Sequence, residues 1–267
     1  MSISRAFKAL FGDSQWLKKV ALGAVIMLIP YVGAIAYMGF GLRYLRDVAW
    51  GRDEHLPEWK DYVEHIKTGL YGFVIGLVYS LPLSIAMAVL VVIAAVGAGA
   101  FIYTESVASI LWLFLALFVV FTLLTVLMGI VLWPAYVQVA LYNSIQAGFD
   151  FKGIYARTRA NSRAFWNAFG KYLLLSLVSL GVTFVVYVAA FGVVGLTLVG
   201  AGPEQAAAGM MLVYPLQLIA MVPLFFLTIP IGLMNYHIWG QYARVAYALD
   251  ATVVPDATTP ETSAQES

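Results

Sequence analysis

The sequence predicts an all-α integral membrane protein, a polytopic transmembrane bundle of about six membrane helices. Hydrophobic residues make up 62% of the chain and charged residues 11%, whereas a soluble domain has about 25% charged residues. Long stretches without Lys, Arg, Asp or Glu exceed the roughly 20 residues that a helix needs to cross a bilayer. Backbone polar groups in lipid must be paired within their own segment, so these stretches are expected to be helices.

Five stretches lack these charged residues. They are Val20–Leu42, Thr68–Thr104, Ser106–Phe149, Tyr172–Pro203 and Gln205–Ala243. Because apolar segments run through most of the chain, we expect residues 13–250 to form a single membrane domain. The acid-, Ser-, Thr- and Pro-containing residues 251–267 predict a disordered cytoplasmic tail.

Residues 1–12 are expected to form a short amphipathic helix lying at the membrane interface. Apolar side chains recur there at helical spacing, which predicts one apolar stripe. The stripe comprises Ile3, Phe7, Leu10 and Phe11. Gly12 is a natural end for this helix.

The distribution of the 15 Lys and Arg residues predicts the topology. They lie before the first apolar stretch, between the first and second, between the third and fourth, and after the last, so these connections are expected to be cytoplasmic. The first stretch must then enter and leave on the same side. Pro30 and Gly33 at its centre predict a helical hairpin, roughly Ser14–Ile29 and Tyr31–Trp50.

Two alternatives to this hairpin remain open at the level of the sequence. A single span kinked at Pro30 would place the N-terminus outside. Alternatively, Lys18, Lys19 and the following apolar run resemble a cleavable signal peptide. Cleavage is disfavoured because it would place the basic loop that begins at Arg43 outside the cell.

The connection between the third and fourth stretches combines positive charges with aromatic residues, a composition that favours contact with anionic lipid headgroups. Four basic residues there are the candidate headgroup contacts, namely Arg157, Arg159, Arg163 and Lys171. Nucleic-acid binding is disfavoured because the net charge is only +1.

Prolines within the long apolar segments are candidate interruptions of the helices, such as those that line substrate sites in transporters, but ordinary proline kinks are the preferred interpretation. The candidate helix-break positions are Pro30, Gly33, Pro134 and Pro230. Three further polar residues are candidates for an intramembrane site, namely Gln138, Asn235 and His237. For the two amides, packing and hydrogen bonding between helices is the preferred interpretation.

No catalytic, cofactor or metal site is predicted. Cysteine is absent, and no phosphate-binding loop, His-Glu-x-x-His or Gly-x-Ser-x-Gly motif occurs. Asp61 and His65 lie one helical turn apart, but two ligands are a weak metal signal, and we expect a charge-stabilised surface pair instead. The protein is therefore expected not to be an enzyme.

The N-terminal residues carry a resemblance to a known family. Asp13, Trp16, the Ile29-Pro30 step, the Gly- and Arg-containing segment that follows, and Leu56-Pro57-Glu58-Trp59 resemble the opening of the DUF4013 family of prokaryotic multi-pass membrane proteins of unknown function. The distinctive part covers about the first 60 residues. The resemblance implies a protein of the prokaryotic cell membrane and supplies no catalytic residues.

Three functional hypotheses follow. The preferred one is a non-enzymatic membrane-organising protein or accessory subunit that acts through its cytoplasmic face, with both termini cytoplasmic. Its expected partners are membrane lipids and either an unidentified membrane protein or a second copy of the chain. The second hypothesis is a small-molecule or lipid transporter component with a site between proline-broken helices, and the third is an intramembrane lipid enzyme.

Overall fold

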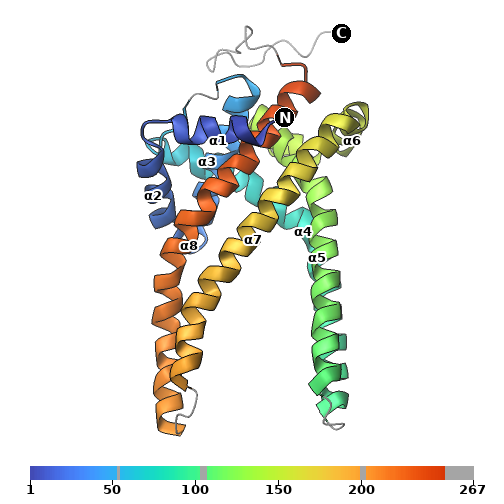
Figure 1. Cartoon of the computed structure of the whole chain (residues 1–267). Helices are drawn as coiled ribbons and strands as arrows, with labels where there is room; N and C mark the ends of the chain where they lie inside the picture. The colour runs from blue at the N-terminus through green and yellow to red at the C-terminus, as the bar shows by residue number, and fades with distance from the viewer. Residues whose placement is uncertain (53–54, 103–106, 199–202, 250–267) are drawn as a thin grey trace.

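The computed structural model describes residues 1–52, 55–102, 107–198 and 203–249, and every regular element within these ranges is helical (Figure 1). In chain order the elements are α1 (Ile3–Gly12), α2 (Trp16–Met27), α3 (Val32–Ala49), α4 (Tyr62–Ile102), α5 (Val107–Tyr142), the 3-10 turn η1 (Gln146–Phe149), α6 (Phe151–Ala160), α7 (Ser162–Leu198) and α8 (Pro203–Ala246). The expected all-α class is confirmed.

Four of these helices are long and apolar enough to cross a membrane. Their candidate spans are Tyr62–Ile93, Leu115–Tyr142, Ser162–Ala190 and Ile219–Ala246. α4 packs along α5 and α7 along α8, which gives two helical hairpins, and α3 packs against both α4 and α8. Figure 1 shows the two hairpins joined at one end and diverging toward the other.

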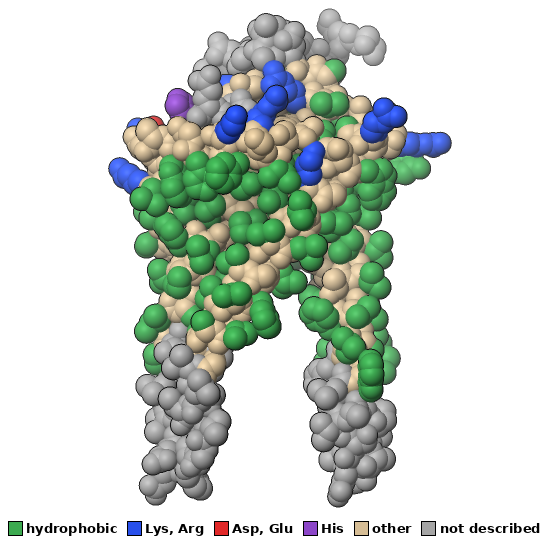
Figure 2. All heavy atoms as spheres, in the orientation of Figure 1, with side chains coloured by type: hydrophobic (Ala, Val, Ile, Leu, Met, Phe, Trp, Pro, Cys, Tyr) green, Lys and Arg blue, Asp and Glu red, His purple; other side chains and the backbone are tan. Residues whose placement is uncertain are grey.

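The surface of the two hairpins is strongly apolar. Within the most apolar windows of α5 and α7 only 6% of residues are buried inside the protein, against 33% in α8. Hydrophobic side chains cover much of the described part of the hairpins on the face shown in Figure 2, while Lys and Arg side chains gather around their joined end. Apolar surface of this extent is stable in lipid and not in water, as required of a membrane protein.

The joined end, here called the head, comprises α1, α2, α3, η1 and α6 together with the adjoining ends of the four long helices. Its interior is rich in aromatic side chains. Trp239 of α8 is fully buried and stacks on Trp133 of α5, with ring centroids 5.4 Å apart. Phe165 of α7 lies 5.8 Å from Trp239. These contacts join three of the four long helices at the head.

The backbones of α3 and α4 come into direct contact at two glycines. A Cβ atom added to Gly39 would lie 1.7 Å from the carbonyl oxygen of His65, and one added to Gly69 would lie 1.9 Å from that of Ile35. Small residues of this kind allow helices to approach closely in membranes. The crossing therefore depends on the absence of a side chain at both positions.

The first apolar stretch forms two helices rather than one. α2 ends at Met27 and α3 begins at Val32, and Pro30 lies in the connecting turn. Tyr31 adopts a positive φ of 60° there. Gly33 allows the start of α3 to approach the end of α2, because a Cβ atom at this position would lie 2.0 Å from the carbonyl oxygen of Ile26.

Pro134 and Pro230 were candidate helix-break positions, with a kink as the preferred interpretation, and neither proline ends its helix. α5 continues through Pro134 to Tyr142, and α8 continues through Pro230 to Ala246. A proline removes one hydrogen bond from the helical ladder. Leaving the helix altogether would expose further unpaired backbone groups to lipid, which is more costly.

α1 matches the expected N-terminal helix. Within the predicted apolar stripe, Leu10 is fully buried in the head whereas Phe7 is 53% exposed, and Ala6 is buried beside Leu10. The helix begins after Ser2, whose hydroxyl accepts a hydrogen bond from the backbone N–H of Arg5 at 3.3 Å. The spacing of apolar residues identified the helix but not the part of the protein that it would contact.

Candidate functional site

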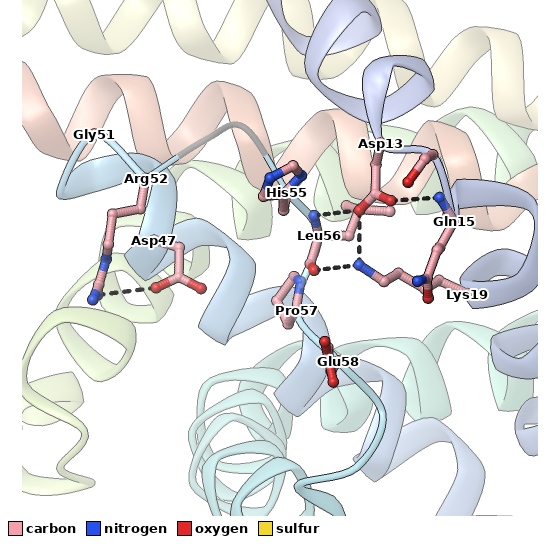
Figure 3. Close-up of a pocket in the computed structure, with 11 residues that line it drawn as sticks. Asp13, Gln15, Lys19, Asp47, Gly51, Arg52, His55, Leu56, Pro57 and Glu58 are labelled. Atoms are coloured by element: carbon pink, nitrogen blue, oxygen red, sulfur yellow. Dashed lines mark hydrogen bonds and ion pairs between the residues drawn. The ribbon is translucent and has the colours of Figure 1, made fainter.

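A buried ion pair joins the N-terminal segment to the loop before α4 (Figure 3). The Asp13 carboxylate accepts hydrogen bonds from Lys19 Nζ at 2.7 Å, the backbone N–H of Gln15 at 2.7 Å and that of Leu56 at 2.9 Å. Lys19 Nζ also donates to the carbonyl oxygen of Leu56 at 2.7 Å. The side chains of Asp13 and Lys19 are only 3% and 11% exposed.

Trp59 completes this arrangement. Its indole N–H donates to the carbonyl oxygen of Lys19 at 2.9 Å, and its ring stacks on Phe40 of α3 with centroids 4.3 Å apart. Asp13, Lys19, Leu56 and Trp59 are here called the clasp. The clasp holds together α2, α3 and the loop before α4.

The clasp favours the charged form of Asp13. Burial alone would raise the pKa of this carboxyl, but the hydrogen bonds from Lys19, Gln15 and Leu56 outweigh burial and hold the pKa below its ordinary value. The carboxylate is therefore a fixed negative charge with its acceptor sites occupied. Such a group orders the structure and is poorly suited to proton transfer.

A pocket of about 700 Å³ opens beside the clasp. Asp47 lines it and pairs with Arg52 at 3.0 Å, and His55 and Glu58 line it as well (Figure 3). Burial raises the pKa of Asp47, opposed by the nearby positive charges of Arg52, Arg43 and Arg46. Among the described residues, no group of three or more His, Cys, Asp or Glu could hold a metal ion.

The expected surface pair of Asp61 and His65 is wrong. His65 is fully buried, and its Nε2 is hydrogen-bonded to the carbonyl oxygen of Glu58 at 2.8 Å. Asp61 instead pairs with Arg43 at 3.2 Å. The histidine ring packs inside the head, where it contacts both rings of the stacked pair Phe40 and Trp59.

Two of the four predicted headgroup contacts bind the chain itself. The guanidinium of Arg157 lies 4.7 Å above the ring centre of Tyr247. Lys171 Nζ donates to the carbonyl oxygen of Met1 and to the side-chain oxygen of Asn167. Both side chains thus contribute to packing in the head.

The other two predicted contacts, Arg159 and Arg163, are exposed. Lys152, Tyr155 and Arg159 share one face of α6 at spacings of three and four residues, and all three are exposed. Arg163 and Trp166 lie one turn apart at the start of α7 and are also exposed. These five residues are here called the basic rim, and none of its three cations forms an ion pair within the described part of the chain.

The N-terminus is docked on α8 by a reciprocal pair of hydrogen bonds. The backbone N–H of Ser2 donates to the side-chain oxygen of Gln241 at 2.8 Å, and the amide nitrogen of Gln241 donates to the carbonyl oxygen of Ser2 at 3.2 Å. The start of the chain and the end of α8 therefore lie together in the head.

The three predicted intramembrane polar residues are buried, but they occupy different environments. His237 is hydrogen-bonded through Nδ1 to the hydroxyl of Tyr44 at 3.0 Å. Gln138 lies on α5 and is 2% exposed. Asn235 lines a second pocket, of about 260 Å³, formed by residues of α2, α3, α7 and α8. Pro230 adjoins this pocket between two of its lining residues, Ile229 and Ile231.

Sequence reasoning did not find the clasp. Asp13 and Trp59 stood out only as parts of the family resemblance. The contact between Asp13 and Leu56 uses the backbone N–H of Leu56, so the type of side chain at that position does not predict it. The only available signal was an acidic residue placed directly before an apolar, lysine-containing helix.

Comparison with known proteins supports the family resemblance. No curated protein matches the chain, and no solved structure matches it. The family described as "Protein of unknown function (DUF4013)" matches residues 22–195, well beyond the N-terminal motif. The chain belongs to the DUF4013 family.

Proposed function

We propose that the protein is a non-enzymatic membrane organiser that gathers anionic lipids through the basic rim at the cytoplasmic face of a prokaryotic cell membrane. The observation that carries the proposal is the exposure of Lys152, Arg159 and Arg163 together with Tyr155 and Trp166. Cations attract anionic headgroups, and amphipathic aromatic rings suit the same interfacial layer.

The proposal includes a topology. Both termini lie on the cytoplasmic side, α2 and α3 form a re-entrant hairpin on that side, and the total is about six membrane helices. The docking of Ser2 on Gln241 supports termini on one side of the membrane. The concentration of Lys and Arg side chains around the head supports its cytoplasmic location (Figure 2).

The chain has no cysteine, so a single introduced cysteine reports topology without background. A cysteine at Ser4 should be protected from an impermeant thiol reagent in intact cells and labelled after permeabilisation. Labelling in intact cells would contradict the proposed topology.

Lipid preference is tested with a charge-matched pair of variants. One variant carries Arg159→Gln and Arg163→Gln, and the control carries Arg52→Gln and Lys60→Gln, which lie in other ion pairs. Each basic residue near an anionic surface contributes roughly 1 kcal/mol. Losing two of them should therefore lower the enrichment of phosphatidylglycerol over phosphatidylcholine around the purified protein by about thirtyfold.

The readout is native mass spectrometry of the protein released from nanodiscs of mixed composition. The control should keep the enrichment of the unmodified protein. An equal loss in both variants would show that net charge, rather than the basic rim, determines lipid preference.

A further inference from the structure

The pocket around Asn235 is a second polar feature, separate from the basic rim. Its α7 and α8 residues lie within the candidate spans Ser162–Ala190 and Ile219–Ala246, and Met27 and Tyr37 line it from α2 and α3. Ser176, one of its lining residues, lies about 15 Å along α7 from Trp166 of the rim. Met27, Phe225 and Thr228 line it and remain partly exposed, so the pocket opens on a surface that faces lipid.

Asn235 is the unusual group of this pocket. The residue is 8% exposed, and its side-chain carbonyl oxygen is buried without a hydrogen-bond partner among the described residues. An unpaired buried acceptor of this kind destabilises a protein by about 1–3 kcal/mol. Its position on a pocket wall indicates that a donor from outside the chain completes it.

Four hydroxyl groups also line the pocket, those of Tyr37, Ser176, Ser179 and Thr228, and two of them already donate their hydrogens within the chain. The hydroxyl of Tyr37 donates its hydrogen to the carbonyl oxygen of Ile229 at 3.3 Å, and that of Thr228 donates to Leu224 at 2.7 Å. Each oxygen keeps lone pairs that can accept. A ligand that satisfies the Asn235 oxygen must therefore donate a hydrogen bond, and the two serine hydroxyls can donate to it or accept from it.

The charge of the lining narrows the ligand class. No Asp, Glu, Lys, Arg or His is among the described residues that line this pocket. An ammonium donor would lack a counter-charge, and burying it there would be costly. A neutral hydroxyl donates equally well at no such cost.

Size indicates how much of the ligand enters. A pocket of about 260 Å³ accommodates a small headgroup but not an entire lipid, since one water occupies roughly 30 Å³ in the liquid. We propose that this pocket binds the hydroxyl-bearing headgroup of a neutral lipid, of the diacylglycerol or long-chain-alcohol type, with Asn235 as its principal acceptor. The hydrocarbon chains remain in the surrounding bilayer.

The test compares dioleoylglycerol with its acetylated analogue, which has the same chains but no hydroxyl. Retention of each lipid by the purified full chain is measured by native mass spectrometry over a range of lipid concentrations. The hydroxyl form should be retained at about tenfold lower concentration, the equivalent of one net hydrogen bond. Equal retention of the two forms would overturn the proposal.

Asn235→Leu removes the acceptor at similar volume. This variant should lose the preference for the hydroxyl form, while its thermal stability stays the same or rises because an unpaired polar group has been removed. The matched control is Thr122→Val, which removes an exposed hydroxyl from α5 and should keep the preference. A preserved preference in Asn235→Leu would refute the assignment.

A second variant keeps the proposal testable if Asn235→Leu folds poorly. A Cβ atom at Gly232 would lie 2.3 Å from the Tyr37 hydroxyl oxygen, so Gly232→Ala should narrow the pocket and weaken dioleoylglycerol retention. Unchanged retention in this variant would overturn the site. Retention of oleyl alcohol is measured in the same way. If it is retained as strongly as dioleoylglycerol, the hydroxyl alone is recognised; if it is retained more weakly, the glycerol headgroup is recognised.

Discussion

Removal of the Asp13 carboxylate is the sharpest perturbation of the head. Asp13→Ala leaves the buried ammonium of Lys19 with the carbonyl oxygen of Leu56 as its remaining partner, and it leaves two backbone N–H groups without their acceptor. Breaking a buried ion pair by removing one member costs about 3–5 kcal/mol. Because Lys19 keeps one hydrogen bond, we expect a loss near the lower end, about 3 kcal/mol.

The assay is unfolding in mixed micelles titrated with sodium dodecyl sulfate and followed by tryptophan fluorescence. The matched control is Glu58→Ala, which breaks an ion pair to Lys60 whose side chains are 55% and 82% exposed. Exposed pairs contribute little to stability because water and salt screen them, so the control should be nearly neutral. A loss in Asp13→Ala no larger than that in Glu58→Ala would refute the structural role of the clasp.

A double-mutant cycle separates the ion pair from its surroundings. If Asp13 and Lys19 act as a unit, the combined alanine variant should lose less stability than the two single losses added together, by about 1–3 kcal/mol. Strictly additive losses would show that the two side chains stabilise the head independently.

Three further predictions follow from the head. Because the pKa of Asp13 is lowered in the folded protein, its carboxylate contributes stability that is fully present above the ordinary value of 3.8 and is lost as pH falls through the lower folded value. The melting temperature should therefore fall on acidification, and Asp13→Asn should flatten this acidic part of the plot of melting temperature against pH. Gly39→Ala should lower stability by more than about 2 kcal/mol in the sodium dodecyl sulfate titration, because its Cβ would overlap a backbone carbonyl. The control is Gly170→Ala, which has open space around its Cβ and should be neutral or stabilising. Gln241→Ala should cost about 1–2 kcal/mol and increase hydrogen exchange at Ser2; unchanged exchange would show that the N-terminus is held by other contacts.

The sequence was sufficient to predict the membrane class, because that class depends on composition and on the length of apolar segments. It did not decide between a break and a kink at Pro134 and Pro230, where local propensity and membrane environment favour opposite outcomes. The same residue type lies in a turn at Pro30 and within a helix at Pro230. The cost of leaving unpaired backbone groups in lipid depends on how deep the residue lies in the membrane, and the helix propensity of a residue carries no information about that depth.

The candidate site was less predictable than the fold. Arg157 and Arg159 are two residues apart in one basic segment, yet the first lies over Tyr247 and the second is exposed. Residues two apart on a helix point in different directions, but which of these directions faces the interior depends on where α8 ends. Asn235 was identified as polar and intramembrane, whereas its missing partner is visible only once four helices surround it.

The length of α8 has a mechanical consequence. The helix has 44 residues, which corresponds to a rod of about 66 Å, against roughly 30 Å of hydrocarbon in a bilayer. A rod of this length acts as a lever, since rotating it by about 10° displaces one end by about 11 Å relative to the other. Transmembrane helices change tilt with bilayer thickness, so a thinner or thicker membrane would move the head relative to the far ends of the hairpins.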